Sequence, residues 1–143
     1  MTLLSYEYIR GLIDGEGCFT FSSTPNKTGK VKLPAFILRM CIRDKALIES
    51  VRDTLKLKNK IYTYHYRYKD ADRQPQSILI VRDFGSLKSK IIPLFYKKLH
   101  GYKRIQFEEW INLIEQDPLV SKDYKLLPKL YKNGYFDQIT SFN

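Results

Sequence analysis

Two acidic residues, Asp14 and Glu16, flank Gly15 at the end of a predicted short helix and are the first candidates for chemistry. At that end the helix dipole is negative and the last carbonyl groups have no intrahelical donor, so both carboxylates call for a compensating positive charge. Mg²⁺ would supply it, because this ion accepts carboxylate and backbone carbonyl oxygens, and the carbonyl of Gly15 is a natural second ligand beside Glu16. The spacing alone leaves a second interpretation open, in which the acids are solvated at an ordinary glycine-capped helix end.

The segment from Ser5 to Gly17 predicts the helix that positions these acids. Ser5 is a favourable N-cap residue, and Ile9, Leu12 and Ile13 recur at the spacing of one apolar helix face. The helix should therefore bury this face against the rest of the chain.

Gly11 and Gly15 lie four positions apart on the same helix, where each glycine costs about 1 kcal/mol relative to alanine. A helix face without side chains allows another backbone to approach closely, as small residues do between membrane helices. The sequence therefore predicts a helix–helix interface formed by Tyr8, Gly11, Leu12 and Gly15.

Four blocks of sequence point to a known family. The nonapeptide at 9–17 reads I-R-G-L-I-D-G-E-G, and it is followed by I-R-D-K-A-L-I-E-S-V at 42–51, I-I-P-L-F at 91–95 and L-H-G-Y-K-R-I-Q-F-E-E-W at 99–110. In content and order these blocks resemble those of the LAGLIDADG homing endonucleases, of the type with a single motif.

The resemblance implies a site-specific endonuclease that cleaves double-stranded DNA by metal-dependent hydrolysis. Glu16 would be the essential metal ligand, Asp14 would mainly organise the helix end, and Lys103 would lie beside the scissile phosphate. Mg²⁺ is the expected cofactor, with Mn²⁺ as a substitute and Ca²⁺ supporting binding without cleavage. The family often carries a polar residue at the position of Ile42, and its absence leaves Arg39 or Arg43 as substitutes.

Composition agrees with a nucleic-acid partner. The chain has 143 residues, a net charge of +10 and a pI near 9.6, which favours a polyanion as the ligand. We expect one endonuclease domain over 1–117, with residues 118–143 as its basic, aromatic C-terminal extension. No secretory pattern or apolar run long enough for a membrane span is present, so an intracellular protein is expected, in an organelle or in a prokaryotic cytoplasm.

The order of the predicted elements is αββαββα, which indicates an α+β fold with a four-stranded antiparallel sheet. The resemblance makes this sheet one half of a DNA-binding saddle. A strand of about 8 residues spans roughly 26 Å, or about 8 base pairs, so that a homodimer would cover a near-palindromic site of about 20 base pairs.

The third predicted strand, Ile61 to Lys69, alternates tyrosines with polar or cationic residues, and we expect the polar face to contact DNA. The alternative to DNA binding is that this polar face is simply exposed to solvent, as is common on a basic protein. The residues expected to bind DNA are Ser22, Thr24, Lys30, Lys32, Arg39, Arg43, Thr63, His65, Arg67, Lys69, Gln76, Arg82, Lys125 and Lys129.

Two other functions remain open at this stage. A maturase would use the same basic surface to bind an intron RNA, and a degenerate relative would bind DNA without cutting it. Retention of both Asp14 and Glu16 argues against the second of these.

Overall fold

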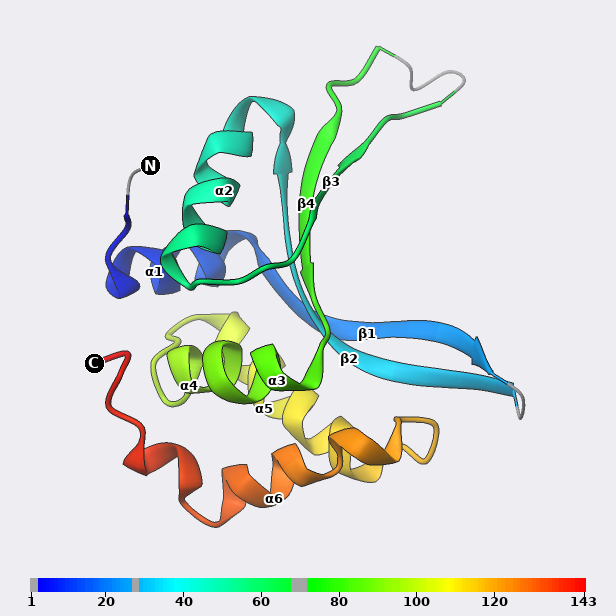
Figure 1. The fold of residues 1–143 in the computed structure, drawn as a ribbon, viewed down its shortest axis with the longest axis vertical. Helices are drawn as coiled ribbons and strands as arrows, with labels where there is room; N and C mark the ends of the chain where they lie inside the picture. Colours follow the sequence, from blue (N-terminus) through cyan, green and yellow to red (C-terminus); the bar gives the residue numbers. More distant parts are fainter. Residues whose placement is uncertain (1–2, 27–28, 68–71) are drawn as a thin grey trace.

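The computed structural model describes residues 3–26, 29–67 and 72–143. The helices and strands in these residues are α1 Tyr6–Glu16, β1 Gly17–Asn26, β2 Gly29–Cys41, α2 Lys45–Thr54, β3 Ile61–Tyr64, β4 Gln76–Val81, α3 Phe84–Ser86, α4 Ile92–Phe95, α5 Tyr102–Gln116 and α6 Leu126–Lys132 (Figure 1). A π-helical turn, Leu87–Ile91, joins α3 to α4. This architecture confirms the predicted α+β fold.

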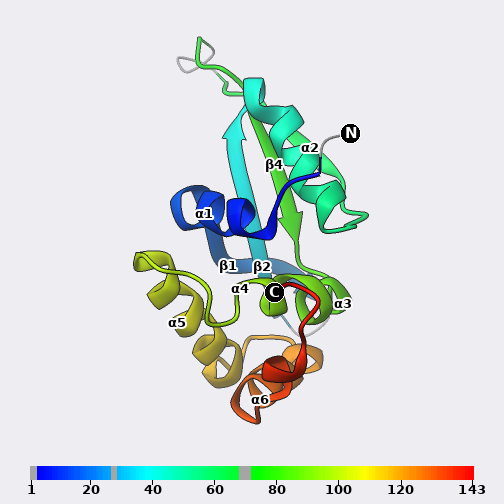
Figure 2. The ribbon, with the colours of Figure 1, turned by 90° about the vertical axis from the view of Figure 1, so that its left-hand side faces the viewer.

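The strands form one antiparallel sheet in the order β1-β2-β4-β3. Figures 1 and 2 show the helices on one side of this bent sheet, whereas its other side carries no helix formed by the described residues. We call these two sides the helix-covered face and the open face. Because side chains alternate along a strand, the register assigns Leu38 and Leu79 to the helix-covered face and their neighbours Arg39 and Ile78 to the open face.

The core lies between the helix-covered face and the helices, and Phe19 is at its centre. The Phe19 ring centroid is 4.8 Å from that of Phe107, 5.2 Å from that of Trp110, and 5.6 Å from those of Phe36 and Phe95. These rings come from β1, β2, α4 and α5, so one aromatic cluster joins the sheet to the helical layer.

The C-terminal residues pack back onto α1. The guanidinium of Arg10 donates to the carbonyl oxygen of Leu94 at 2.7 Å and to that of Phe142, and the rings of Tyr6 and Phe142 lie 5.1 Å apart. Partial burial lowers the pKa of Arg10, an effect that the nearby charge of Glu7 opposes. Across the described residues, no helix combines the length and the apolar character needed to cross a membrane.

The third strand differs from its prediction in both length and phase. β3 ends at Tyr64, and Thr63 pairs with Ser77 in the phase of the helix-covered face, whereas Tyr62 and Tyr64 share the open face with Arg39. The register therefore places Thr63 in the phase opposite to that of Tyr62 and Tyr64, away from the open face on which Arg39 lies. Both tyrosines are about half exposed, because the described helices lie on the other face of the sheet.

The remaining residues predicted on that polar face lie beyond the strand. His65 and Arg67 are exposed but follow the end of β3, and Lys69 lies outside the described residues.

Candidate active site and nucleic-acid interface

Local sequence explains both ends of α1. The Oγ of Ser5 accepts a hydrogen bond from the backbone nitrogen of Tyr8 at 3.1 Å, which confirms the predicted N-cap. At the other end, the Gly17 nitrogen donates to the Ile13 carbonyl, and a Cβ at Gly17 would lie 2.5 Å from Cγ2 of the fully buried Ile13. Glycine is therefore required immediately after Glu16 for the chain to leave the helix along this path.

The carboxylate of Asp14 accepts hydrogen bonds from backbone groups just before α5. Its Oδ2 lies 3.2 Å from the His100 nitrogen, and its Oδ1 lies 3.4 Å from the Gly101 nitrogen. These donors are at the positive end of the α5 dipole, where a carboxylate is favoured. Asp14 thus joins the end of α1 to the start of α5.

Three side chains on one face of α5 bind the first residues of β1. Lys103 Nζ donates to the Gly17 carbonyl, Gln106 Oε1 accepts from the Phe19 nitrogen at 3.1 Å, and Trp110 Nε1 donates to the Thr20 carbonyl at 2.7 Å. They attach β1, an edge strand, to the helical layer directly after Glu16.

Gln106 is a residue of this site that the sequence did not indicate as functional. The only sequence signal was its spacing of three from Lys103 and four from Trp110, which places all three on adjacent turns of one helix face.

Glu16 is exposed at the end of α1, and no described residue forms a hydrogen bond or ion pair with its carboxylate. Among the described residues no group of three or more His, Cys, Asp or Glu side chains is arranged to hold a metal. One free carboxylate beside the Gly15 carbonyl still fits Mg²⁺, which commonly takes one or two carboxylates and completes its shell with water and substrate phosphates. The donor set in one chain is therefore suitable but incomplete.

Among the described residues, nothing packs closely on the two glycines of α1. Tyr8 is 49% exposed, Leu12 is partly buried, and a Cβ built on Gly11 or Gly15 meets no atom within 4 Å. No described helix of the same chain therefore makes the predicted close contact at Gly11 and Gly15.

The open face of the sheet brings together several of the residues expected to bind DNA. The strand register assigns Ser22, Thr24, Arg39 and Gln76 to this face, and Arg82 follows β4 as an exposed residue. Arg39 and Arg82 form no ion pair with any described acid. Arg43 is exposed in the turn that follows β2.

Two lysines expected at DNA are engaged elsewhere. Lys32 Nζ lies 2.7 Å from Asp117 Oδ2, and this hydrogen bond is the main cause that lowers the pKa of Asp117. Lys125 Nζ donates to the carbonyls of Ile114, Glu115 and Asp117 at the end of α5. Partners distant in the sequence thus bind both ammonium groups, a pairing that the sequence did not indicate.

Lys30 and Lys129 are exposed in places that the sequence did not specify. Lys30 has the same strand parity as Lys32, opposite to that of Arg39, and Lys129 lies on α6 in the helical layer. A direct DNA contact by either residue stays a prediction.

An acidic helix end beside a helix-free sheet face with unpaired arginines points to the class of DNA endonucleases. The family model described as LAGLIDADG endonuclease matches residues 9–114, and the chain belongs to this family. None of the curated proteins matches the chain.

Solved structures share the fold. The homing endonuclease I-TnaI is 18% identical with a TM-score of 0.61, and the match covers 92% of this chain and 99% of that one. I-LtrWI bound to its target DNA (23% identity, TM-score 0.64) and I-GzeII in complex with its DNA target (26% identity, TM-score 0.58) are each matched over 100% of this chain. This chain spans only 46% of the length of each of these two proteins.

Proposed function

We propose that the protein is a homodimeric homing endonuclease that cleaves both strands of a near-palindromic DNA site of about 20 base pairs with the aid of Mg²⁺. The observation that carries this proposal is the contrast between the two motif acids. Asp14 is hydrogen-bonded to the backbone before α5, whereas Glu16 is exposed and has no partner among the described residues.

Hydrolysis of a phosphodiester requires an activated water, neutralisation of the developing charge and stabilisation of the leaving oxygen, and bound Mg²⁺ would supply Lewis acidity for these needs. Glu16 and the Gly15 carbonyl would hold the ion. Lys103 would contribute positive charge near the phosphate, while its hydrogen bond to the Gly17 carbonyl holds the ammonium group next to the Glu16 end of α1.

Two chains would meet through α1. The glycine-bearing face is open in one chain, and two copies related by a two-fold axis would bring their Glu16 residues together, one for each DNA strand. The length comparison supports a need for two copies, since I-LtrWI and I-GzeII are more than twice as long as the part that this chain matches.

The open face would read the target. Ser22, Thr24, Arg39 and Gln76 supply donors and acceptors there, and Tyr62 and Tyr64 replace the residues first expected from β3. Arginine and polar side chains distinguish base pairs through the major groove, which is wide enough for two strands of a sheet. DNA would therefore lie along the helix-free side seen in Figure 1.

The test is Glu16→Gln, which keeps the side-chain size and removes the charge. With a duplex recovered by cleavage from a randomised library, we expect cleavage with Mg²⁺ to disappear and binding with Ca²⁺ to remain. Glu7→Gln on the first turn of the same helix is the matched control and should cut normally, because Glu7 is exposed far from the helix end.

Asp14→Asn should instead lower stability together with activity, because it weakens the link to α5. Undiminished cutting by Glu16→Gln would refute the catalytic role, and loss of binding by that variant would assign Glu16 a structural role.

A further inference from the structure

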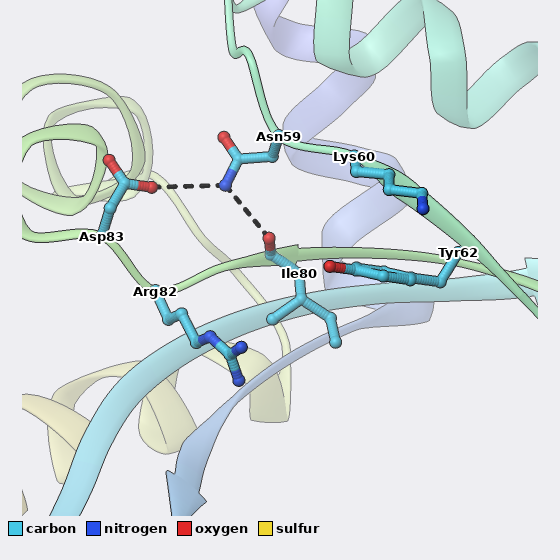
Figure 3. Close-up of a pocket in the computed structure, with 6 residues that line it drawn as sticks. All are labelled: Asn59, Lys60, Tyr62, Ile80, Arg82 and Asp83. Atoms are coloured by element: carbon cyan, nitrogen blue, oxygen red, sulfur yellow. Dashed lines mark hydrogen bonds between the residues drawn. The ribbon is translucent and has the colours of Figure 1, made fainter. Parts of the chain in front are cut away.

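Two adjoining clefts lie where the chain enters β3 and leaves β4. The first, of about 510 Å³, is lined by Asn59, Lys60, Tyr62, Ile80, Arg82 and Asp83 (Figure 3). The second, of about 400 Å³, is lined by Lys56, Lys58, Asn59, Asp83 and Ser86. Because they share Asn59 and Asp83, we treat them as one groove, the edge groove.

The edge groove is cationic. Lys56, Lys58, Lys60 and Arg82 are all exposed, and none forms an ion pair with a described acid. In Figure 3 Lys60 extends over Tyr62, and its Nζ lies 5.4 Å from the centre of that ring. No lysine of this set was expected from the sequence to contact DNA.

Asp83 is the one acid among the lining residues, and its charge is already satisfied. Its Oδ1 accepts from Asn59 Nδ2 at 3.2 Å and its Oδ2 from the Ser86 nitrogen at 3.0 Å. Partial burial acts to raise the pKa of Asp83, but these hydrogen bonds outweigh burial and lower it. Asn59 also donates to the Ile80 carbonyl at 3.2 Å, so the same amide fixes both walls of the groove (Figure 3).

Lys56 occupies a backbone position that usually favours glycine. Its φ is 56°, directly after α2, where the Leu57 nitrogen donates to the Arg52 carbonyl and the Lys56 nitrogen to that of Asp53. This is the hydrogen-bonding pattern of a helix C-terminus in which the left-handed residue is most often glycine. A lysine here places a positive charge in the groove, and its left-handed conformation strains the backbone.

The edge groove lies at the opposite side of the sheet from the motif helix. β3 and β1 are the two edges of the sheet, and β1 follows α1 directly. Figure 2 shows α1 and β1 toward one side of the molecule and the ends of α2 and β4 toward the other. In a dimer that meets through α1, the groove would face the outer end of each half-site.

We propose that the edge groove binds phosphates of the target DNA at the outer end of each half-site, through Lys56, Lys58 and Lys60. This inference rests on the proposed function and adds a sequence-independent contact to it. Such contacts release counterions, so they strengthen binding and make it more sensitive to salt without reading bases.

The test uses two variants, Lys56→Gly and Lys60→Ala, and a duplex selected by cleavage from a randomised library with about ten further base pairs at each end. Lys60→Ala should reduce the slope of log affinity against log salt by about 2 for a dimer, since each lost phosphate contact contributes about 0.9. Lys56→Gly should reduce it similarly while raising Tm, because glycine relieves the left-handed backbone.

Lys97→Gly is the matched control. Lys97 is the other described non-glycine residue with a positive φ, 57°, and it pairs with Asp137 in the helical layer away from the groove. This variant should bind DNA with the wild-type salt slope, so relief of backbone strain alone would not account for a change in Lys56→Gly.

Shortening the duplex until the outermost base pairs of each half-site are lost should weaken the wild type more than either groove variant. Wild-type slopes for both groove variants on the long duplex would overturn the inference, and so would a reduced slope that does not depend on duplex length. Failure of the wild type to select or bind any duplex would instead overturn the proposed function.

Discussion

Gly11→Ala should stabilise a single chain and weaken its dimer. Within one copy nothing lies within 4 Å of the added Cβ, so the substitution meets no steric penalty and recovers the helix propensity of alanine, about 1 kcal/mol. For a chain of this size that gain corresponds to a rise in Tm of about 4 °C. In the dimer the same methyl group would face the partner backbone, where overpacking typically costs about 1–3 kcal/mol.

The assay combines urea unfolding of dilute protein with sedimentation velocity over a range of concentrations. We expect higher stability at low concentration and a larger dissociation constant for Gly11→Ala, and complete separation of the subunits for Gly11→Leu. A variant that is destabilised when dilute, or that dimerises as tightly as the wild type, would refute the assignment of this face. An active monomer of wild type on DNA would refute the dimer itself.

Gly17→Ala on the same segment provides the contrast. Its Cβ would lie 2.5 Å from Ile13 Cγ2, which belongs to a fully buried, branched side chain that cannot move aside easily. We therefore expect a loss of about 1–3 kcal/mol at every protein concentration. The two substitutions thus differ in the sign of their effect on the single chain.

Three further predictions concern the sheet and the helical layer. Tyr62→Ala should change the preferred target bases, whereas Thr63→Ala on the other face should not, as measured by selection from a randomised library. Lys125→Met should lower the free energy of unfolding by about 1–2 kcal/mol, because it removes the donor to the last α5 carbonyls, and should leave the salt dependence of DNA binding unchanged. Burial raises the pKa of Tyr131 to about 12, so the folded state favours the neutral phenol. The stability that this residue contributes below about pH 10 should therefore be lost between about pH 10 and 12. Thermal unfolding at alkaline pH should show a smaller loss for Tyr131→Phe.

The motif helix could be predicted from the sequence because its determinants are local. The Ser5 cap, the buried Ile9 and Ile13, and the helix end before Gly17 depend on neighbours within one or two turns. The sequence also indicated Arg39 on the face opposite Leu38, since strand alternation alone decides that relation.

Tertiary structure decided the phase of β3. The sequence predicted that its polar face contacts DNA. An edge strand outside the helical cover has no core that selects one face, however, and only pairing with β4 sets its register. Propensity could not distinguish the two faces of Tyr62 and Thr63, because tyrosine and threonine are both common in strands.

Tertiary structure also decided which charged groups have partners in the folded chain. The partner of Lys32 is Asp117 and the acceptors of Lys125 are the end carbonyls of α5, which become neighbours only when the helical layer packs on the sheet. The difference between Asp14, which is hydrogen-bonded, and Glu16, which has no described partner, likewise depends on where His100 and Gly101 lie in the fold. Residue type therefore determined which groups are able to bind DNA or metal, and the packing of distant segments determined which of them remain free to do so.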